Sequence, residues 1–456
     1  MSPVERRSVG VIASLYAMRM IGLFMVLPVF MVLGKDLEGA TPALLGMAIG
    51  AYGLTQALLQ IPFGMLSDRF GRKPVIVTGL LIFAAGSLVA AVSDSIYGVI
   101  AGRFLQGAGA IASALMALLS DVTREEARTR AMAVVGMSIG LSFIVALLIG
   151  PIIAQWVGLS GLFALTAVMA LLGMVLLAAV PTPRVQTHHL DTSVDASRFS
   201  DVLRHPDLLR LDWGIFSLHL MLTGLFVMLP RLLAEVHQLP VSRHGWLYIG
   251  VMGAGFVAMV PFIIIGEKRR KLREVFIGAV ALLVASLAVL DGVRNHFWGV
   301  VAALFLFFMA FNLLEASLPS LVSKIAPAGL RGSAMGVYAS SQFFGAFLGG
   351  AVGGWLYGHF QYEGVLGFVI GVGVLWLLVA SFMNPPPYAT SMTLHLSEAA
   401  LADPAGTLNR LRSLDGLEDV VILEEEGLAY LKVDEAKLDL SVLTQGPWAR
   451  NDESKV

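Results

Sequence analysis

The sequence predicts an all-α membrane protein with twelve transmembrane helices in two six-helix halves, followed by a small α+β domain. Hydrophobic residues make up 57% of the chain and charged residues only 14%, a balance too apolar for an ordinary soluble protein. Apolar runs near the roughly 20 residues that cross a bilayer recur along most of the chain. Short stretches of the first half return in the second half, and the chain becomes polar only after residue 384.

Each apolar run is expected to be a helix, because an isolated segment in lipid can satisfy its backbone groups only within itself. The ninth run is the shortest. The predicted spans are 9–33, 43–65, 74–92, 97–119, 131–154, 161–180, 213–234, 245–266, 275–290, 297–322, 334–357 and 364–384.

Several classes of protein are excluded by composition. The chain has no cysteine, which rules out disulfides, thiolate metal sites and thiol catalysis. Its net charge of -1 gives no reason to propose a nucleic acid partner. The first apolar run follows Arg6 and Arg7 without a small-residue cleavage site, so we expect it to be a retained span and not a signal peptide.

The distribution of cations predicts the orientation in the membrane. Most Lys and Arg residues between the spans lie on the side of the N-terminus, whereas the opposite loops hold only Lys35, Arg231, Arg243 and Arg294. Cationic loops stay in the cytoplasm, so both the N-terminus and the C-terminal domain are expected there.

The two halves are predicted from an internal repeat. Residues 22–28 return as 224–230, and the Pro62-Phe63 pair returns as Pro261-Phe262. Such a repeat predicts two bundles with a binding site between them at mid-depth. The predicted parts are a first bundle at 1–180, a cytoplasmic linker at 181–212, a second bundle at 213–384 and a soluble domain at 385–456.

A polar stretch at 64–73 lies between the second and third spans and predicts a tight cytoplasmic turn. It holds one carboxylate among three cations, and its two glycines permit positive φ or close backbone approach. It could merely fix topology as a cationic loop. Alternatively it forms a conformational gate, in which Arg72 pairs with Asp121 at the same membrane level. The residues of this predicted gating loop are Gly64, Asp68, Arg69, Gly71, Arg72, Lys73 and Asp121.

Ionisable groups deep in the spans predict the working site, since each costs about 2.5–3.5 kcal/mol at mid-membrane. Arg103 and Gln106 share one face of their helix, and Asn312 and Glu315 share one face of theirs. We expect these stripes to line the cavity between the halves. The predicted proton and substrate cavity contains Arg19, Arg103, Gln106, His219, Asn312 and Glu315.

Glu315 is the leading candidate for a proton carrier, because a carboxyl group in an alternately wet and dry cavity can change its protonation. The structural alternative is a permanent pair of Glu315 with Arg19 or His219. His219 is either a second proton-handling group or a satisfied hydrogen bonder. Arg103 either acts on substrate and proton or is held by backbone carbonyls.

Three motifs resemble those of the major facilitator superfamily. The stretch G-x-L-x-D-R-x-G-R-K is similar to the signature loop between helices 2 and 3 of that family. Residues 103–110 resemble the helix 4 motif of its drug:proton antiporter branch. Gly150-Pro151 resembles the helix 5 antiporter motif, although Ala154-Gln155 stand where two glycines are usual.

The resemblance implies a proton-driven transporter of the bacterial inner membrane that alternates between two open states. It also implies that Asp68 faces the start of helix 11, near Ser333, where the helix dipole favours an anion. The second half keeps only a remnant of the loop at 266–271, without an aspartate in the expected place.

The polar C-terminal part predicts a β-α-β-β-α order. Residues 392–396 alternate as a half-buried strand, Asp403-Pro404 starts a helix, strands at 417–423 and 428–433 form a hairpin, and a last helix runs from 434 to 443. This order resembles a small ferredoxin-like domain, for which a regulatory ligand is a hypothesis.

A secondary transporter fits these features best. A channel would need a continuous polar pore, and an enzyme would need a nucleophile–base pair, a phosphate loop or a metal cluster, none of which the sequence shows. We expect a proton-coupled efflux antiporter for small amphiphilic compounds. Proton–substrate symport and a membrane sensor with a regulatory C-terminal domain are the alternatives. The expected partners are a small molecule, protons and the bilayer, and no cofactor or metal is expected.

Overall fold

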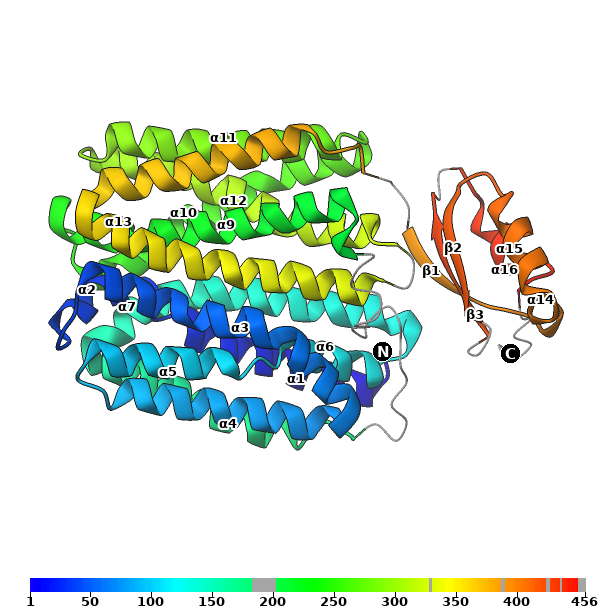
Figure 1. Cartoon of the computed structure of the whole chain (residues 1–456), viewed down its shortest axis with the longest axis horizontal. Helices are drawn as coiled ribbons and strands as arrows, with labels where there is room; N and C mark the ends of the chain where they lie inside the picture. Colours follow the sequence, from blue (N-terminus) through cyan, green and yellow to red (C-terminus); the bar gives the residue numbers. More distant parts are fainter. Residues whose placement is uncertain (183–201, 328–329, 387–389, 424–426, 435–436, 450–456) are drawn as a thin grey trace.

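The computed structural model describes residues 1–182, 202–327, 330–386, 390–423, 427–434 and 437–449. It consists of a long helical bundle and a small α+β domain at one end of it, the end where the N-terminus also lies (Figure 1). Most of the predicted linker, with His188 and His189, lies outside the described residues.

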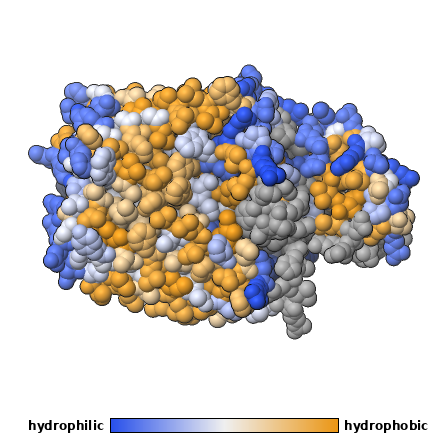
Figure 2. All heavy atoms as spheres, viewed as in Figure 1, coloured by the Kyte–Doolittle hydropathy of each residue, from blue (hydrophilic) through white to orange (hydrophobic). Residues whose placement is uncertain are grey.

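Ten helices in the described part of the chain are long and apolar enough to cross a membrane, when α5 and α6 are counted together. Figure 2 shows hydrophobic residues over the middle of this helical part and hydrophilic residues at its two ends, as expected for a surface that faces lipid. The helices are α1 (Pro3–Phe24), α3 (Pro42–Phe70), α4 (Arg72–Ala91), α5 (Ile96–Ala108), α6 (Ala112–Asp121), α7 (Glu125–Leu177), α9 (Pro206–Arg231), α10 (Val241–Lys268), α11 (Leu272–Val293), α12 (Phe297–Ile325) and α13 (Arg331–Ser381), with the short α2 (Phe30–Leu33), η1 (Gly34–Asp36) and η3 (Leu232–Val236) beside them.

Two pairs of predicted spans fall within single helices, so ten spans are found where twelve were predicted. Helix α7 has 53 residues and a non-helical backbone at Gly158 (φ 66°). Helix α13 has 51 residues and a non-helical backbone at Gln361 (φ 51°). Figure 1 shows the yellow and orange parts of α13 as two lengths of helix joined at one end of the bundle. Both non-helical residues lie in the gaps that the prediction left between the spans, at 155–160 and 358–363.

Two predicted spans are themselves broken. The first span ends its regular helix at Phe24, and a stretch of turns leads to α2. The fourth span is divided into α5 and α6 at Gly109, which leaves the helical conformation (φ -77°, ψ 54°). A broken helix frees backbone carbonyls for other partners, and the Gly109 carbonyl accepts a hydrogen bond from Arg19 Nη2 at 2.8 Å.

The halves meet where glycines let backbones approach closely. A Cβ added to Gly46 of α3 would lie 2.3 Å from the Gly350 carbonyl oxygen of α13, and one added to Gly245 of α10 would lie 2.4 Å from the Leu148 carbonyl oxygen of α7. Close packing of small residues is a main source of helix association in membranes. Substitution at these glycines would therefore separate the halves.

The C-terminal domain has the predicted order with one additional short helix after the first strand, and its small sheet fits a ferredoxin-like domain. The sheet order is β1-β3-β2, with β3 antiparallel to both neighbours. Leu411, Leu431 and Leu443 lie in its core. The elements are β1 (Thr390–His395), α14 (Glu398–Ala402), α15 (Pro404–Arg412), β2 (Leu417–Leu423), β3 (Leu428–Val433) and α16 (Leu440–Thr444).

The last helix begins later than predicted. Asp434 does not start it, because its backbone N–H donates to the Gly416 carbonyl at 2.8 Å and its side chain binds Arg270 of the membrane part. Asp439 instead caps α16, accepting from the Ser441 N–H at 2.9 Å.

Candidate functional site

The polar stretch between α3 and α4 is shorter than predicted. Helix α3 continues to Phe70, Gly71 alone forms the turn (φ 93°), and Arg72 begins α4. The prediction for Gly64 as a turn glycine is therefore wrong, since Gly64 lies buried inside α3. The helix continues because positions 64–70 keep one buried face, with Ser67 donating to the Gly64 carbonyl at 2.7 Å.

Arg72 is the centre of the ionic cluster at this turn. Its Nε donates to Asp121 Oδ2 at 3.0 Å, with side-chain exposures of 5% and 2%, so the predicted pair is present. Its Nη1 donates to Ser67 Oγ at 2.8 Å and also pairs with Asp68. These contacts tie α3, α4 and α6 together.

The two remaining cations of the stretch have different contacts. Lys73 Nζ donates to the Val180 carbonyl beyond the end of α7. Arg69 is exposed, and its guanidinium lies 5.5 Å from the Phe70 ring centroid. Arg69 thus has no described contact that joins it to the Arg72 cluster.

In the N-terminal half, Arg19 is buried among neutral oxygens. Its Nη2 donates to Gln56 Oε1 at 2.7 Å, to the Gly109 carbonyl at 2.8 Å and to Tyr52 Oη at 3.1 Å. These partners lie on α3 and at the break between α5 and α6. The contacts described for Arg19 stay within this half, and the structure does not bring Arg19 to Glu315.

Arg103 is held in a similar way. It donates to the Ala48 carbonyl at 3.1 Å, to the Ile49 carbonyl at 3.3 Å and to Gln106 Oε1 at 2.9 Å. Gln106 in turn donates to Ser87 Oγ at 2.7 Å. The predicted stripe of Arg103 and Gln106 is thus one connected network that joins α5 to α3 and α4.

The C-terminal half brings Glu315 and His219 together, with a third residue between them. Glu315 Oε2 lies 3.9 Å from His219 Nε2. The Gln342 side-chain amide lies 2.8 Å from His219 Nε2 and 3.5 Å from Glu315 Oε1. Because these three residues come from α12, α9 and α13, Glu315 faces the interior of this half. Asn312, one turn before Glu315, makes only a long contact of 3.4 Å to the Met252 carbonyl.

Aromatic contacts connect this cluster to the N-terminal half. The His219 ring lies 6.1 Å from Phe311, and Phe311 lies 6.4 Å from Phe143 of α7. Helices α3 and α13 form a second contact between the halves. There the Tyr52 ring lies 6.0 Å from the ring of Phe343, the residue after Gln342. The cluster lies inside the C-terminal half and is connected through the Phe311 ring to Phe143 of the N-terminal half.

The Tyr52 side chain contacts Phe343 of the other half and both buried arginines of its own half. Its ring lies 5.4 Å from the Arg103 guanidinium carbon and its hydroxyl accepts from Arg19. The two buried cations of one half are thereby connected through one side chain to Phe343 in the other half.

Gly150 and Pro151 lie inside α7. A Cβ at Gly150 would lie 2.2 Å from the Met25 carbonyl oxygen, so this glycine lets α7 approach the end of α1. The motif thus has a packing role next to the break in the first span.

Sequence reasoning missed three polar residues of the C-terminal half. Gln342 was missed because a lone amide in a span rich in glycine gives no periodic signal. Asp212 was assigned to the linker, but α9 begins at Pro206 and places Asp212 within the helix, 6% exposed. Tyr338, 5% exposed, lies one turn before Gln342 on α13, and its hydroxyl has no partner in the described part of the chain.

The described residues contain no group of three His, Asp or Glu side chains placed to hold a metal ion. The described residues instead show a membrane-spanning fold, a close interface between its halves and polar clusters on both sides of that interface. Together they define a multi-pass membrane transporter.

Comparison with known proteins identifies the family. A profile described as Major Facilitator Superfamily matches residues 12–350 and 273–412. The chain is 48% identical over 438 residues to the inner membrane transport protein YajR of Escherichia coli (strain K12), with 95% of each chain covered. It is 27% identical to the multidrug resistance protein MdtH of Aeromonas salmonicida (strain A449), covering 81% of this chain and 94% of that one. The chain belongs to the Major Facilitator Superfamily.

Solved structures agree on the fold. A bacterial homologue of the human lysosomal transporter Spinster, in an inward-facing and occupied conformation, has a TM-score of 0.66 at 13% identity and covers 84% of this chain and 97% of its own. The human organic anion transporter MFSD10 has a TM-score of 0.62 at 19% identity, covering 83% of this chain and all of its own. The family and the relatives are transporters and not enzymes, and the membrane helices and YajR support a multi-pass protein of the bacterial inner membrane.

Proposed function

We propose that this transporter is a proton-coupled antiporter that exports small amphiphilic compounds by alternating access. It would cross the membrane twelve times, with α7 and α13 each contributing two crossings, and both termini would be cytoplasmic. The observation that carries the proposal is the cluster of Glu315, His219 and Gln342 in the C-terminal half, which Phe311 connects to the N-terminal half.

Glu315 is the proposed proton carrier. Its side chain is 40% exposed although it lies in the middle of a membrane helix, and the polar contacts described for its carboxyl group are a histidine at 3.9 Å and an amide at 3.5 Å. A carboxyl group without a fixed cationic partner can gain or lose a proton when the surrounding cavity fills with water or substrate. Glu315 would be protonated in one open state and ionised in the other.

Arg19 and Arg103 would serve as fixed charges. Their hydrogen bonds to neutral oxygens hold them in place, and Tyr52 and Phe343 connect them to the cluster. An ionised Glu315 would attract these two arginines of the N-terminal half more strongly than a protonated Glu315 would. Proton release would therefore favour the closure of the two halves around the cavity.

The cytoplasmic gate would involve Asp68. Helices α3 and α13 run antiparallel, with Gly46 beside Gly354 and Ser340 Oγ donating to the Ala57 carbonyl at 3.0 Å. Continuing this register along α3 brings Asp68 to the level where α13 begins at Arg331. An anion is favoured at a helix N-terminus, so this contact would hold the cytoplasmic side closed while Arg72 fixes the position of Asp68.

The C-terminal domain would be a regulatory module. Arg270 Nη2 lies 2.9 Å from Asp434 Oδ1, and Lys432 Nζ donates to the Lys324 carbonyl at 2.5 Å. Both contacts join the domain to the cytoplasmic ends of helices in the second half. A ligand that binds the domain could therefore bias the movement of this half.

The test is substrate-induced proton release from purified protein, measured across a panel of cationic, neutral and anionic amphiphiles. Compounds that are transported should release protons from the wild type but not from Glu315→Gln. Glu363→Gln is the matched control, because Glu363 is 61% exposed and pairs with Arg294. Proton release that persists in Glu315→Gln would exclude Glu315 as the carrier, and proton uptake with substrate would favour symport.

A further inference from the structure

The first part of α9 holds a buried acid that the proposed function does not use. Asp212 is 6% exposed, and its Oδ2 has no hydrogen-bond partner in the described part of the chain. It lies beyond the first turn of α9, which begins at Pro206, so the helix dipole that favours an anion at an N-terminus contributes little. A buried carboxylate without a partner is costly, and a bound proton removes that cost.

The charged groups near this part of α9 do not pair with Asp212. Besides Tyr338, the ionisable residues at this end of α9, α12 and α13 are His205, Asp207, Arg210, Lys324 and Arg331. Arg210 pairs with Asp207 at 2.6 Å, and Lys324 pairs with Glu267 at 2.8 Å. In the part of the chain that the structure describes, none of these five residues forms an ion pair with Asp212. Its carboxyl group therefore has no fixed cationic partner.

Helices α9 and α13 are in close contact at this level. A Cβ added to Gly345 of α13 would meet the Phe216 carbonyl of α9, and the same kind of contact recurs one turn further along both helices. Because both positions advance in the same direction, the two helices run parallel. Tyr338, two turns before Gly345, therefore lies level with the turn of α9 that ends at Asp212.

Tyr338 is the polar side chain between Asp212 and Glu315. It is 5% exposed, and it lies one turn before Gln342, whose amide is 3.5 Å from Glu315 Oε1. The Tyr338 hydroxyl has no hydrogen-bond partner among the described residues, and the charges of Glu315 and Asp212 both act on it. A polar route from Glu315 to Asp212 therefore passes through Tyr338.

Another side of α9 is closed by tight packing. A Cβ added to Gly214 would lie 3.2 Å from Leu318 Cδ2 and 3.0 Å from Trp376 Nε1. Both of these side chains are fully buried, and Leu318 lies one turn beyond Glu315 on α12. The Trp376 indole N–H is a donor only and cannot accept a proton. Proton transfer from Glu315 along this side is therefore disfavoured.

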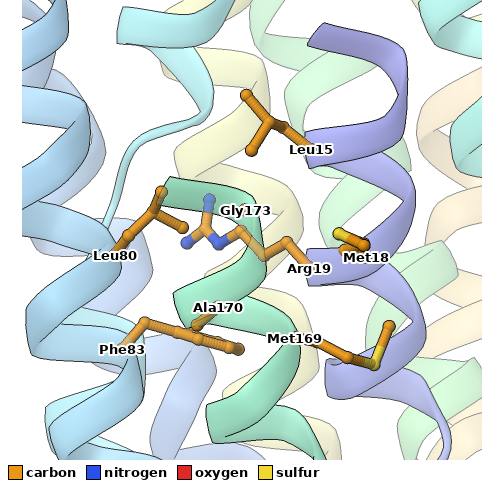
Figure 3. A pocket seen from close by; sticks show the side chains of 8 residues that line it. All are labelled: Leu15, Met18, Arg19, Leu80, Phe83, Met169, Ala170 and Gly173. Atoms are coloured by element: carbon orange, nitrogen blue, oxygen red, sulfur yellow. The ribbon is translucent and has the colours of Figure 1, made fainter. Parts of the chain in front are cut away.

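Arg19 is also buried with unpartnered atoms, but it suits no proton transfer. Figure 3 shows its guanidinium group among Leu80, Phe83 and Gly173 of the N-terminal half, and its Nε and Nη1 have no partner in the described part of the chain. An arginine side chain is not deprotonated in proteins, so Arg19 keeps its charge. A carboxyl group such as that of Asp212 can gain and lose a proton.

We propose that Asp212 is a second proton-binding residue, which receives the proton that leaves Glu315 by way of the Tyr338 hydroxyl. The inference rests on the proposed role of Glu315 as the proton carrier. The O–H bond of protonated Glu315 breaks as its proton passes to the Tyr338 oxygen, and the original hydroxyl proton of Tyr338 passes to the Asp212 carboxylate. Glu315 ends ionised, Asp212 ends protonated and Tyr338 is unchanged. A rotation of the Tyr338 side chain or a bridging water completes the path.

This route separates the proton from the substrate. The Glu315 side chain is 40% exposed, whereas Tyr338 and Asp212 are buried. A substrate bound against the exposed side of Glu315 would cover that side, so the proton would leave on the other side. Asp212 would then pass it to water at the end of α9 that the proposed orientation places in the cytoplasm.

The experiment uses purified full-length protein and the compound of the amphiphile panel that releases most protons from the wild type. Proton release is followed by stopped flow with a pH-sensitive dye, and the carboxylic acid C=O bands by time-resolved infrared spectroscopy. We expect a transient protonated-carboxyl band in the wild type as the Glu315 band is lost. Asp212→Asn should lack the transient band and release protons roughly tenfold more slowly or slower still, because positioned proton-transfer groups contribute at least this much.

The Kd of the compound should be unchanged in Asp212→Asn, which also shows that the variant is folded. Tyr338→Phe, which loses one oxygen atom, should slow proton release in the same way. Asp207→Asn is the matched control on the same helix, since Asp207 pairs with Arg210, and it should release protons at the rate of the wild type.

Three results would overturn the inference while leaving the proposed function intact, provided that Glu315→Gln releases no protons. One is proton release at the wild-type rate in Asp212→Asn. Another is a transient band that persists in Asp212→Asn. The third is an unchanged rate in Tyr338→Phe, which keeps the test decisive even where Asp212→Asn fails to fold. Proton release that persists in Glu315→Gln would instead remove the proposed carrier and the inference with it.

Discussion

The two halves use their buried charges differently. In the N-terminal half, Arg19 and Arg103 are enclosed by fixed oxygens at 2.7–3.3 Å. In the C-terminal half, Glu315 has longer contacts of 3.5 and 3.9 Å and is partly exposed. Charges held tightly by neutral groups are built to stay as they are, whereas a loosely held carboxyl group is free to change its charge. In the proposed function, the first half therefore has a constant electrostatic role and the second half a variable one.

The turns that follow α3 and α10 differ in the same manner. The first half uses Arg72 to join three of its own helices in a buried cluster. The second half has Arg270 at the corresponding turn, and this residue reaches outwards to Asp434 of the soluble domain. One turn stabilises its bundle, and the other connects its bundle to a separate domain.

The largest difference in Tm is expected between substitutions of Arg72 and of Arg69, the two arginines beside the turn at Gly71. Arg72→Ala leaves Asp121, which is 2% exposed, without its cation, and breaking such a buried pair costs about 3–5 kcal/mol. We expect a marked fall in Tm. Arg69→Ala is the control in the same turn and should change Tm little. Equal effects of the two substitutions would show that the Arg72 cluster is not buried in the membrane-embedded protein.

The next largest loss of stability is expected when a glycine that allows close packing between the halves is replaced. In Gly50→Ala the added Cβ would lie 2.5 Å from the Phe347 carbonyl oxygen, and overpacking of this kind costs about 1–3 kcal/mol. We expect lower stability and a wider distance between α3 and α13, measured with paired spin labels. Gly140→Ala should leave both values unchanged, because a Cβ there meets nothing within 4 Å. A Gly50→Ala protein with unchanged label distances would contradict the described interface.

The role of Tyr52 between the halves can be tested by removing its hydroxyl oxygen. Tyr52→Phe keeps the ring contact with Phe343 but loses the acceptor for Arg19, and a hydrogen bond to a charged group contributes about 1.5–3 kcal/mol. We expect a lower Tm with the pH dependence of transport retained. Gln342→Leu should show the opposite pattern, with a small stability change and an altered pH dependence. Similar behaviour of the two variants would remove the distinction between fixed and variable charges.

The smallest effect is expected at the contact of the soluble domain. The Arg270 side chain is 46% exposed and that of Asp434 only 5% exposed, so the loss of this cation affects the soluble domain and not the membrane part. Arg270→Ala should leave the Tm of the membrane part nearly unchanged but raise the proteolytic sensitivity of the connection after residue 384. Arg269→Ala on the same turn is the control. Unaltered proteolysis in Arg270→Ala would mean that this pair does not hold the domain in place.

The sequence was most informative where chemistry is local. Strands β2 and β3 have the predicted bounds, because a short polar stretch ending at Gly427 separates two mainly apolar runs and leaves few other arrangements. The Arg72–Asp121 pair was predictable, since opposite charges at the same membrane level have few other partners. Glu315 could be singled out because an intramembrane carboxyl group is rare.

The features that the sequence did not predict depend on contacts between distant segments of the chain. A non-helical residue, Gly158 or Gln361, lies in each of two gaps between predicted spans, but composition does not show that the helix continues up to that residue on both sides. The break at Gly109 is invisible in a run of small residues that also suits a continuous helix. Which neighbours Arg19 and Glu315 would have could not be predicted, because depth along a helix does not fix the direction that a side chain faces.

The most direct measurement is the infrared difference spectrum of the reconstituted protein on addition of a transported compound. It reports the carboxylic acid C=O band, so it follows the protonation of buried carboxyl groups in the intact membrane. The account predicts that substrate removes a protonated-carboxyl signal in the wild type and in Glu363→Gln, and that this signal is missing in Glu315→Gln. An identical band change in Glu315→Gln would contradict the account, because the variable charge would then lie elsewhere.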